Sequence, residues 1–227
     1  MPGVSASPGP EDKRTFSEEG IMMEGLAIPT LETDRLRLRS FRDSDHDDYA
    51  ALCADPEVSR YLLTGRPFSR EAAWRFMAFH LGHWALRCSG FWAVEEKETG
   101  TFVGRVGFSE PPGWPGLELA GALLRRYWGR GYSLEAGRAA LRFAFETLGK
   151  DRVVSCILPA NRTAIRVVER LGETLERKAL LEGKEFLVYG IDRGAWEKRR
   201  NRGRPAHGTK GPGRSDNGAP RTTNGAQ

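Results

Sequence analysis

Three features that many functional classes require are scarce in this 227-residue sequence. No window approaches 18 consecutive apolar residues, so a membrane-spanning helix is not expected. The first 20 residues contain no apolar stretch of the secretory type, which argues against a signal peptide. The three cysteines, Cys53, Cys88 and Cys156, are odd in number and far apart. Their spacing argues against a disulfide framework or a zinc site and favours a reducing, cytoplasmic location.

What is present is enough to build a folded domain, and the charge is unevenly distributed. Apolar residues make up 39% of the chain, which excludes a wholly disordered protein. The formal net charge is +5, but residues 198–227 contain eight Lys or Arg and one Asp. Residues 1–197 therefore hold 27 basic and 29 acidic side chains. The basic segment either contacts RNA or a ribosome or is a passive solubilising tail.

Composition divides the chain into three parts. Residues 1–30 are rich in Pro, Gly, Ser and Glu and are expected to form a disordered leader. Met22 and Met23 offer a later translation start. Residues 31–198 are expected to form one compact domain, and residues 199–227 a basic disordered tail.

Within the domain, hydrophobic periodicity predicts alternating strands and helices. Strands are expected at Arg35–Phe41, Phe91–Glu95, Phe102–Phe108, Leu117–Leu124, Arg152–Leu158, Leu175–Leu181 and Phe186–Asp192. Helices are expected from Asp43 to Ala54, from Ser69 to about Ser89, from Gly131 to Leu148 and from Asn161 to Leu171. Short turns between consecutive strands favour antiparallel pairing, and the strands on either side of the Gly131–Leu148 helix can be parallel. The predicted fold class is α/β, with a mixed, mostly antiparallel sheet of about seven strands and helices on both faces.

The most informative segment is Leu117–Ala136, where a strand enters a glycine-containing turn that leads directly into a helix. Gly129 and Gly131 allow close approach to the backbone, and the helix start supplies N–H groups, so the turn fits a phosphate group. Three arginines add positive charge, at positions 125, 126 and 130. A P-loop is excluded because no Gly-Lys-Ser/Thr is present, and the element order argues against a dinucleotide-binding turn. The alternative is an ordinary tight helix entry with exposed arginines.

Two motifs carry a resemblance to a known family. Trp128-Gly-Arg-Gly-Tyr-Ser-Leu-Glu-Ala136, followed by Pro159-Ala-Asn-Arg-Thr-Ala-Ile-Arg-Val-Val-Glu-Arg-Leu-Gly172, resembles the GNAT superfamily of N-acetyltransferases. Within it, the chain is similar to the RimJ/RimL branch of ribosomal-protein N-terminal acetyltransferases. The resemblance implies a GNAT-like fold and acetyl-CoA as co-substrate, without a metal. It also implies direct transfer of the acetyl group, through a tetrahedral intermediate, to a protein N-terminus or a small-molecule amine.

The resemblance also implies a set of cofactor-binding residues. The family's pyrophosphate motif fits in two registers: Arg126, Gly129 and Gly131, or Trp128, Gly131 and Ser133. We prefer the second register, because it places the N–H groups on the first turn of the helix. Asn161 matches the motif's asparagine, and it also suits a helix N-cap. The implied cofactor contacts are Leu123, Leu124, Trp128, Gly129, Arg130, Gly131, Tyr132, Ser133, Leu134 and Asn161.

Glu118 is the candidate general base, since it lies on the strand that leads to the cofactor turn. The alternative is a solvent-facing strand glutamate or a salt bridge to an arginine. A backbone N–H near Leu123 and Leu124 would stabilise the oxyanion. Val168 occupies the position at which the family carries the tyrosine that acts as general acid, which leaves the general acid unassigned. The fallback proton donors are Tyr127, Tyr132 and Ser133.

The remaining signals are weaker. His80 and His83 are expected to be packing or surface residues, because no further ligand follows at metal spacing. The aromatic residues of the second helix are expected to pack, and some could line the substrate cleft, which in this family borders Tyr61–Pro67. Two alternative functions stay open. One is a CoA-binding module that has lost catalysis, and the other is a ribosome- or RNA-associated protein that acts through its tail.

Overall fold

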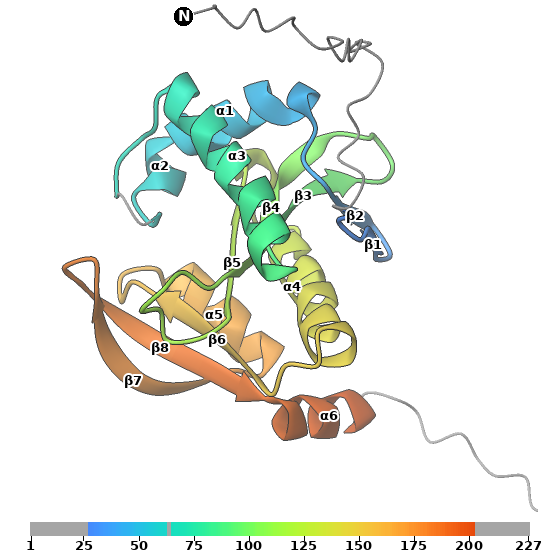
Figure 1. The fold of residues 1–227 in the computed structure, drawn as a ribbon, viewed down its shortest axis with the longest axis vertical. Coiled ribbons are helices and arrows are strands. Elements are labelled where there is room, and N and C mark those ends of the chain that lie inside the picture. Colours follow the sequence, from blue (N-terminus) through green and yellow to red (C-terminus); the bar gives the residue numbers. More distant parts are fainter. Residues whose placement is uncertain (1–26, 63–64, 203–227) are drawn as a thin grey trace, which may run out of the picture.

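The computed structural model describes residues 27–62 and 65–202, and eight strands within them form one mixed sheet (Figure 1). The strands are β1 Leu31–Glu32, β2 Leu36–Arg39, β3 Phe91–Glu96, β4 Phe102–Ser109, β5 Glu118–Leu123, β6 Arg152–Ile157, β7 Thr174–Leu181 and β8 Lys184–Asp192. Their order is β1-β2-β3-β4-β5-β6-β8-β7, and among them only β5 and β6 pair in parallel. The predicted fold class is confirmed. The additional strand, β1, has two residues, too few for an alternating pattern.

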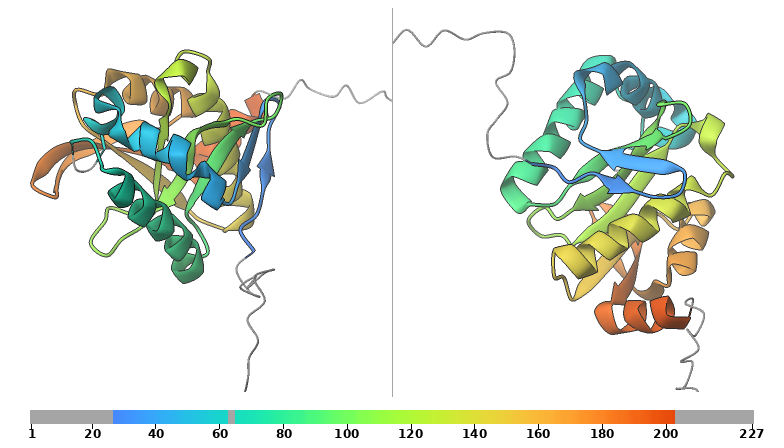
Figure 2. Two further views of the ribbon diagram at one scale, coloured as in Figure 1. Left: turned by 90° about the horizontal axis from the view of Figure 1, so that it is seen from above. Right: turned by 90° about the vertical axis from the view of Figure 1, so that its right-hand side faces the viewer.

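Helices cover both faces of the sheet. They are α1 His46–Ala54, α2 Pro56–Ser59, α3 Arg70–Arg87, α4 Tyr132–Arg142, α5 Arg162–Leu171 and α6 Arg193–Arg202. Short 3-10 turns occupy η1 Asp43–Asp45 and η2 Arg125–Tyr127, and the π-helical turn η3 Phe143–Thr147 extends α4. Helices α1 to α3 lie on one face of the sheet, and α4 and α5 on the other (Figure 2). No helix of residues 27–62 and 65–202 has the length and apolar character to cross a membrane.

Most helix ends follow the sequence signals. The Ser69 hydroxyl caps α3 by accepting from the Ala72 N–H at 3.1 Å, and Gly172 ends α5 in the left-handed conformation at φ +103°. The prediction that Asp43 caps the first helix was wrong. The helical segment begins at Asp43 with η1, whose N-cap is Arg42, and continues into α1 from His46 to Ala54.

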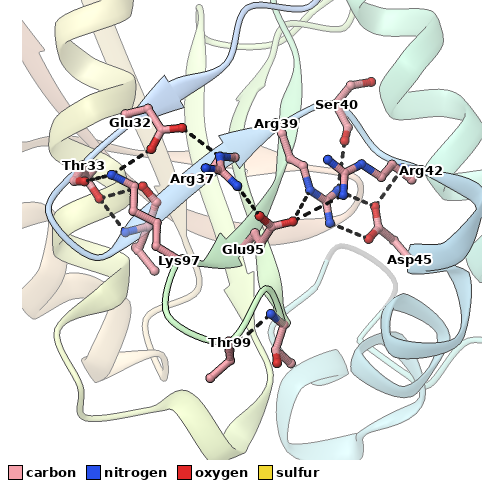
Figure 3. A network of polar contacts seen from close by, with 12 residues as sticks. Glu32, Thr33, Arg37, Arg39, Ser40, Arg42, Asp45, Glu95, Lys97 and Thr99 are labelled. Carbon is pink, nitrogen blue, oxygen red and sulfur yellow. Dashed lines mark hydrogen bonds and ion pairs between the residues drawn. The ribbon is translucent and has the colours of Figure 1, made fainter.

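The carboxylate of Asp45 ties the start of α1 to the sheet through a buried network (Figure 3). Asp45 accepts from the Arg42 N–H at 2.7 Å and from both terminal nitrogens of Arg39, at 2.7 and 2.8 Å. The Arg39 Nε donates to Glu95 on β3 at 2.6 Å. Arg39 is 5% exposed, so its buried charge depends on these two carboxylates. The network fixes β2, β3 and the first helical turn relative to one another.

Helix α6 continues to Arg202, four residues past the expected end of the domain. Arg199 donates to the Arg170 carbonyl at 2.9 Å, and Arg200 pairs with Glu146. Residues 1–26 of the predicted leader and 203–227 of the predicted tail lie outside the described residues, as do Met22 and Met23. The disorder of these two segments stays a prediction. Residues 27–30 of the predicted leader are described: Ile28 packs against the core, and the Pro29 carbonyl accepts from the Trp92 indole N–H at 2.8 Å.

Candidate active site

The turn between β5 and α4 holds two glycines in the left-handed backbone region. Gly129 has φ +77° and Gly131 has φ +82°, a conformation that residues with a Cβ rarely adopt. The first hydrogen bond of α4 runs from the Glu135 N–H to the Gly131 carbonyl at 3.1 Å. The N–H groups of residues 132–134 therefore have no partner within the helix. They form a donor set at the positive end of an 11-residue helix, which suits an anion.

Side chains from distant segments hold this turn in shape. Arg35 donates to the Arg130 carbonyl at 3.1 Å and pairs with Glu135 on α4 at 2.6 Å. The Tyr132 hydroxyl donates to Glu96 on β3. Sequence reasoning missed these clamps, because the partners lie up to 100 residues apart. Since the Tyr132 proton is already engaged, this residue is a poor fallback acid.

The three arginines near the turn are about half exposed, and each has an acidic neighbour. The pairs are Arg125–Asp55 at 3.7 Å, Arg126–Asp48 at 3.1 Å and Arg130–Glu96 at 3.8 Å. Exposed ion pairs of this kind contribute only about 0–1 kcal/mol each. The guanidinium groups can therefore exchange these partners for a phosphate at little cost.

The end of β5 has one backbone N–H directed away from its antiparallel neighbour. The Leu124 N–H donates to the Val103 carbonyl on the β4 side at 2.9 Å. Successive N–H groups of a strand point to opposite edges, so the Leu123 N–H faces the β6 side. The Leu123 carbonyl accepts from the Trp128 indole N–H at 2.8 Å. Of the two predicted backbone positions, Leu123 therefore has the N–H available to a ligand between β5 and β6.

Strands β5 and β6 share a single bridge, at Glu118 and Val154. The Val154 N–H donates to the Leu117 carbonyl at 3.0 Å, and the Ser155 hydroxyl to the Leu119 carbonyl at 2.9 Å. Beyond these contacts the two strands form no ladder, although both continue. The sheet therefore opens between them, and the opening leads toward the β5–α4 turn.

Glu118 is buried at the start of this opening and is 9% exposed. Its Oε2 accepts from the Trp114 indole N–H at 2.6 Å, and its Oε1 from the Cys156 backbone N–H at 3.3 Å. Burial raises the pKa of Glu118 to about 7, against the lowering effect of the two hydrogen bonds and of the Arg105 charge. Glu118 is thus neither solvent-facing nor in an ion pair with a described arginine. The Trp114 contact was not expected from the sequence.

A second buried carboxylate, Glu173, lies near the first and was also missed. It is 2% exposed, its Oε1 accepts from the Ser155 hydroxyl at 3.1 Å, and its Oε2 has no described partner. Burial, with a smaller effect from the Glu118 charge, raises the pKa of Glu173 to about 8. Burial and Glu118 also raise the pKa of the Cys156 thiol to about 12, so Cys156 is no nucleophile at neutral pH.

Helix α5 places the second motif beside β6. The Asn161 Oδ1 accepts from the Ala164 N–H at 3.1 Å, which confirms its role as N-cap. Val168 packs with Ile157 and Tyr189 in a small apolar cluster and supplies no proton donor. Tyr127, another fallback donor, is buried, whereas Ser133 is half-buried.

Helix α3 carries a shallow groove and two structural histidines. A groove of about 490 Å³ is lined by Arg66, Pro67, Phe68, Ser69, Ala72, Arg75, Phe76 and Phe79. Among the predicted packing aromatics, Trp84 is buried, whereas Trp74 and Phe79 are about half exposed.

His80 bonds the Tyr49 hydroxyl at 3.0 Å, and the Glu110 N–H donates to His83 at 3.0 Å, so both rings have structural partners. Within the described segments, no group of three or more His, Cys, Asp or Glu is arranged to hold a metal.

Taken together, the turn, the opening and the buried carboxylate provide three chemical functions in a row. The turn can bind phosphate, the opening can take an extended polar chain along the β5 backbone, and Glu118 can accept a proton near pH 7. This arrangement fits an extended molecule that carries phosphate at one end and reaches into the opening of the sheet with the other.

Comparison with known proteins agrees with this geometry. Residues 35–174 match the model of the acetyltransferase (GNAT) domain. The protein YkkB of Bacillus subtilis is 29% identical over 167 residues, which cover 70% of this chain and 93% of YkkB. An acetyltransferase structure from Agrobacterium tumefaciens has a TM-score of 0.67 at 34% identity and covers 74% of this chain and 96% of its own.

A second similar structure was solved with ligands. It is the spermidine N-acetyltransferase of Vibrio cholerae, in complex with CoA and spermine. Its TM-score is 0.61, and the alignment covers 73% of this chain and 99% of that one. At 16% identity, it supports the fold alone.

Proposed function

Because the chain belongs to the GNAT acetyltransferase family, we propose that it transfers an acetyl group from acetyl-CoA to the nitrogen of a primary amine. The observation that carries the proposal is the position of Glu118. A buried carboxylate with a pKa of about 7 lies at the opening of the sheet, on the strand that leads to an N–H-lined turn. A base with this pKa is half ionised at neutral pH, where proton transfer is most effective.

The residues around the turn would hold the co-substrate. We assign the pyrophosphate to the N–H groups of Tyr132, Ser133 and Leu134, with Gly129 and Gly131 allowing close approach. Arg130 and Trp128 border the same site. The pantetheine arm would lie in the opening along the end of β5, beside Leu123 and Leu124. This assignment follows the register of Trp128, Gly131 and Ser133.

The reaction needs one proton removed and one charge stabilised. Glu118, directly or through water, takes the proton of the incoming ammonium, because only the free amine has a lone pair to attack with. As the new C–N bond forms, the carbonyl oxygen gains negative charge, which the Leu123 N–H is placed to stabilise. The C–S bond then breaks, CoA leaves as a thiolate, and the nitrogen gives its remaining surplus proton to that thiolate or to water, which yields the neutral amide. Since an ordinary thiol has a pKa of about 8.5, the thiolate can leave without a dedicated acid, and Val168 is no obstacle.

Within the family, we place the chain near the RimJ/RimL branch, on the Trp128-Gly-Arg-Gly131 sequence. The acceptor would then be a protein N-terminus or a small amine, met in the cytoplasm. Two alternatives have specific support. Val168 in place of a tyrosine favours a CoA-binding module without catalysis, and the basic residues after Lys198 favour contact with RNA or a ribosome.

The test is thiol release from acetyl-CoA with a panel of amines, amino acids and amino-terminal peptides, together with mass spectrometry of the acceptor. We expect release of one thiol for each acetyl group found on the acceptor. CoA binding without turnover on any amine would instead support the binding module. RNA binding that persists after deletion of residues 203–227 would contradict the proposed role of these residues in the tail.

A further inference from the structure

Arg105, in the middle of β4, is a buried guanidinium group without an acidic partner. It is 6% exposed, its Nε is enclosed with no hydrogen-bond partner, and no carboxylate of the described residues lies within 4 Å. Arg39 is equally buried but is bound by Asp45 and Glu95 (Figure 3). A guanidinium has five N–H donors, and burying its charge is costly unless they are used. Arg105 is therefore an exception within a protein that pairs its other deeply buried arginine fully.

Two aromatic rings flank the Arg105 guanidinium, and one of them also lines the α3 groove. The Arg105 Cζ lies 4.3 Å from the ring centre of Phe91 and 5.6 Å from that of Phe76. Phe76 is among the lining residues of the groove, whereas Arg105 is not. The groove lining includes two arginines and no carboxylate, and both arginines have partners of their own. Phe76 thus connects the groove with the buried Arg105.

Arg105 shares a face of the sheet with Glu118. Arg105 lies opposite Ala122 in the β4–β5 register, and alternate residues of β5 place Ala120 and Glu118 on that same face. Glu118 and Ala122 are four residues apart, about 13 Å between Cα atoms at the usual strand rise. The side chains between them on this face, Ala120 and Ala122, are small, and the two groups are near enough for the Arg105 charge to lower the pKa of Glu118.

We propose that Arg105 binds a carboxylate of the amine acceptor, so that the enzyme selects amines whose own molecule carries an anion near the amine. The inference rests on the proposed acetyltransferase function and specifies its substrate class. An acceptor amine beside Glu118 and a carboxylate beside Arg105 satisfy both buried groups at once. The groove next to Phe76 accommodates an apolar part of the same acceptor.

The test compares acceptors that differ only in charge. The peptide pair is an alanyl-glutamate dipeptide amide and its alanyl-glutamine twin, and the small-molecule pair is the α-amide of glutamate against the α-amide of glutamine, so that only one member of each pair carries a carboxylate. We expect kcat/KM to be at least tenfold higher for the anionic member of at least one pair. The pair that shows this difference indicates whether the acceptor is a peptide or a single amino acid. In Arg105→Gln this ratio falls to about one, whereas Arg105→Lys keeps part of it. Arg87→Gln, an exposed change at the end of α3, leaves the ratio unchanged.

Other outcomes separate the rival roles. If Arg105→Gln lowers kcat/KM equally for both members and moves the pH dependence upward, Arg105 acts only on the charge of Glu118 and the inference is overturned. Equal rates for both members in the wild type overturn it as well, while acetyl transfer itself still stands. If no acceptor is acetylated, the proposed function fails. Calorimetric binding of the same pairs then tests the inference alone, because equal affinities would contradict it.

Discussion

At the scale of single residues, the chemistry depends on carboxylates that the fold has removed from water. Glu118 is enclosed by the Trp114 indole and the β6 backbone, and burial moves its pKa to about 7. Glu173 is enclosed more completely and keeps its proton at neutral pH. An exposed strand glutamate would be ionised well below pH 7 and would be a weaker base.

Glu118→Gln removes the proposed base and keeps the shape of the side chain, and its one amide oxygen can still accept from one of the two N–H partners, Trp114 or Cys156. In the wild type, Glu118 must be ionised, so kcat/KM rises with pH through about 7 in addition to the rise caused by the amine's own deprotonation. We expect the variant to lose about 100-fold in kcat/KM and to lose the inflection near pH 7. Glu98→Gln, in the exposed β3–β4 turn, should keep the wild-type kcat/KM and the inflection near pH 7. An unchanged rate in Glu118→Gln would remove Glu118 as the base.

Glu173 makes a prediction about stability. Its pKa is about 8 in the folded protein and near 4.3 when unfolded, so the folded state binds more protons between these values. The free energy of unfolding therefore falls as pH rises from about 4.3 to about 8, by at most about 1.4 kcal/mol per pH unit. The free energy of unfolding of Glu173→Gln does not contain this decrease. Its difference from the wild-type value, measured by urea denaturation, should therefore grow in favour of the variant as pH rises over that range. Glu185→Gln, on the exposed hairpin, should track the wild type, and equal slopes for all three proteins would contradict the account.

At the scale of secondary structure, the site is assembled where elements end. Helix α4 begins after a glycine in the left-handed conformation, α5 begins after an asparagine that caps it, and β5 separates from β6 after one bridge. Each of these ends leaves backbone groups without a partner, and those groups are what a ligand can use.

The N-cap of α5 can be separated from its proposed cofactor contact. The Asn161 Oδ1 is used by the Ala164 N–H, which leaves the amide Nδ2 for the cofactor. Asn161→Ala should lose about 1 kcal/mol of stability, whereas Asn161→Ser should keep most of it, because serine also caps helices. We expect both variants to raise the KM for acetyl-CoA. A normal KM in Asn161→Ser would show that Asn161 only caps the helix.

Local signals predicted most elements correctly, because their cause is local. The alternation of Leu36–Arg39, the cap at Ser69 and the stop at Gly172 depend on neighbouring residues alone. Helix α6 and strand β1 were missed, since α6 has no periodic apolar face and β1 is too short. The predicted cap at Asp43 was wrong because Asp45 takes that part: its carboxylate accepts from the Arg42 N–H and also binds the buried Arg39.

The candidate site could be predicted only in part, for a related reason. The glycine turn is contiguous in sequence, so its residues were found from the motif. The burial of Glu118 depends on Trp114, which reaches it from the β4–β5 connection, and on Cys156 of β6. Ser155 reaches Leu119 only through the sheet order, and Glu173 comes near this site through its contact with Ser155. Contacts of this kind depend on tertiary packing, which no local pattern in one sequence encodes.

At the scale of the whole molecule, positive charge and chemistry are separated along the chain. Residues 1–197 are nearly neutral, and the excess of basic residues begins at Lys198. Inside the domain, the positive groups that matter are local: the α4 terminus, the arginines near the turn and the buried Arg105.

Deletion of residues 203–227 should therefore leave kcat and both KM values within about twofold for a small amine, because these residues follow α6, the last described element, and include none of the proposed site residues. The measurement is steady-state thiol release by the full-length and truncated proteins at low and moderate salt. A large loss of kcat with a small acceptor would contradict this separation. A loss confined to ribosomal or peptide acceptors would indicate that the tail recruits them.

The central claim is that the β5–α4 turn binds acetyl-CoA. The most direct measurement is calorimetric titration of CoA into the wild type, Gly131→Asp and Gly149→Asp. Both glycines have left-handed backbones with room for a Cβ, and aspartate tolerates that conformation better than most residues. Only Gly131 lies at the proposed phosphate site, so Gly131→Asp should bind CoA at least about 100-fold more weakly while Gly149→Asp binds normally. Wild-type affinity in Gly131→Asp, or an equal loss in both variants, would contradict the assignment.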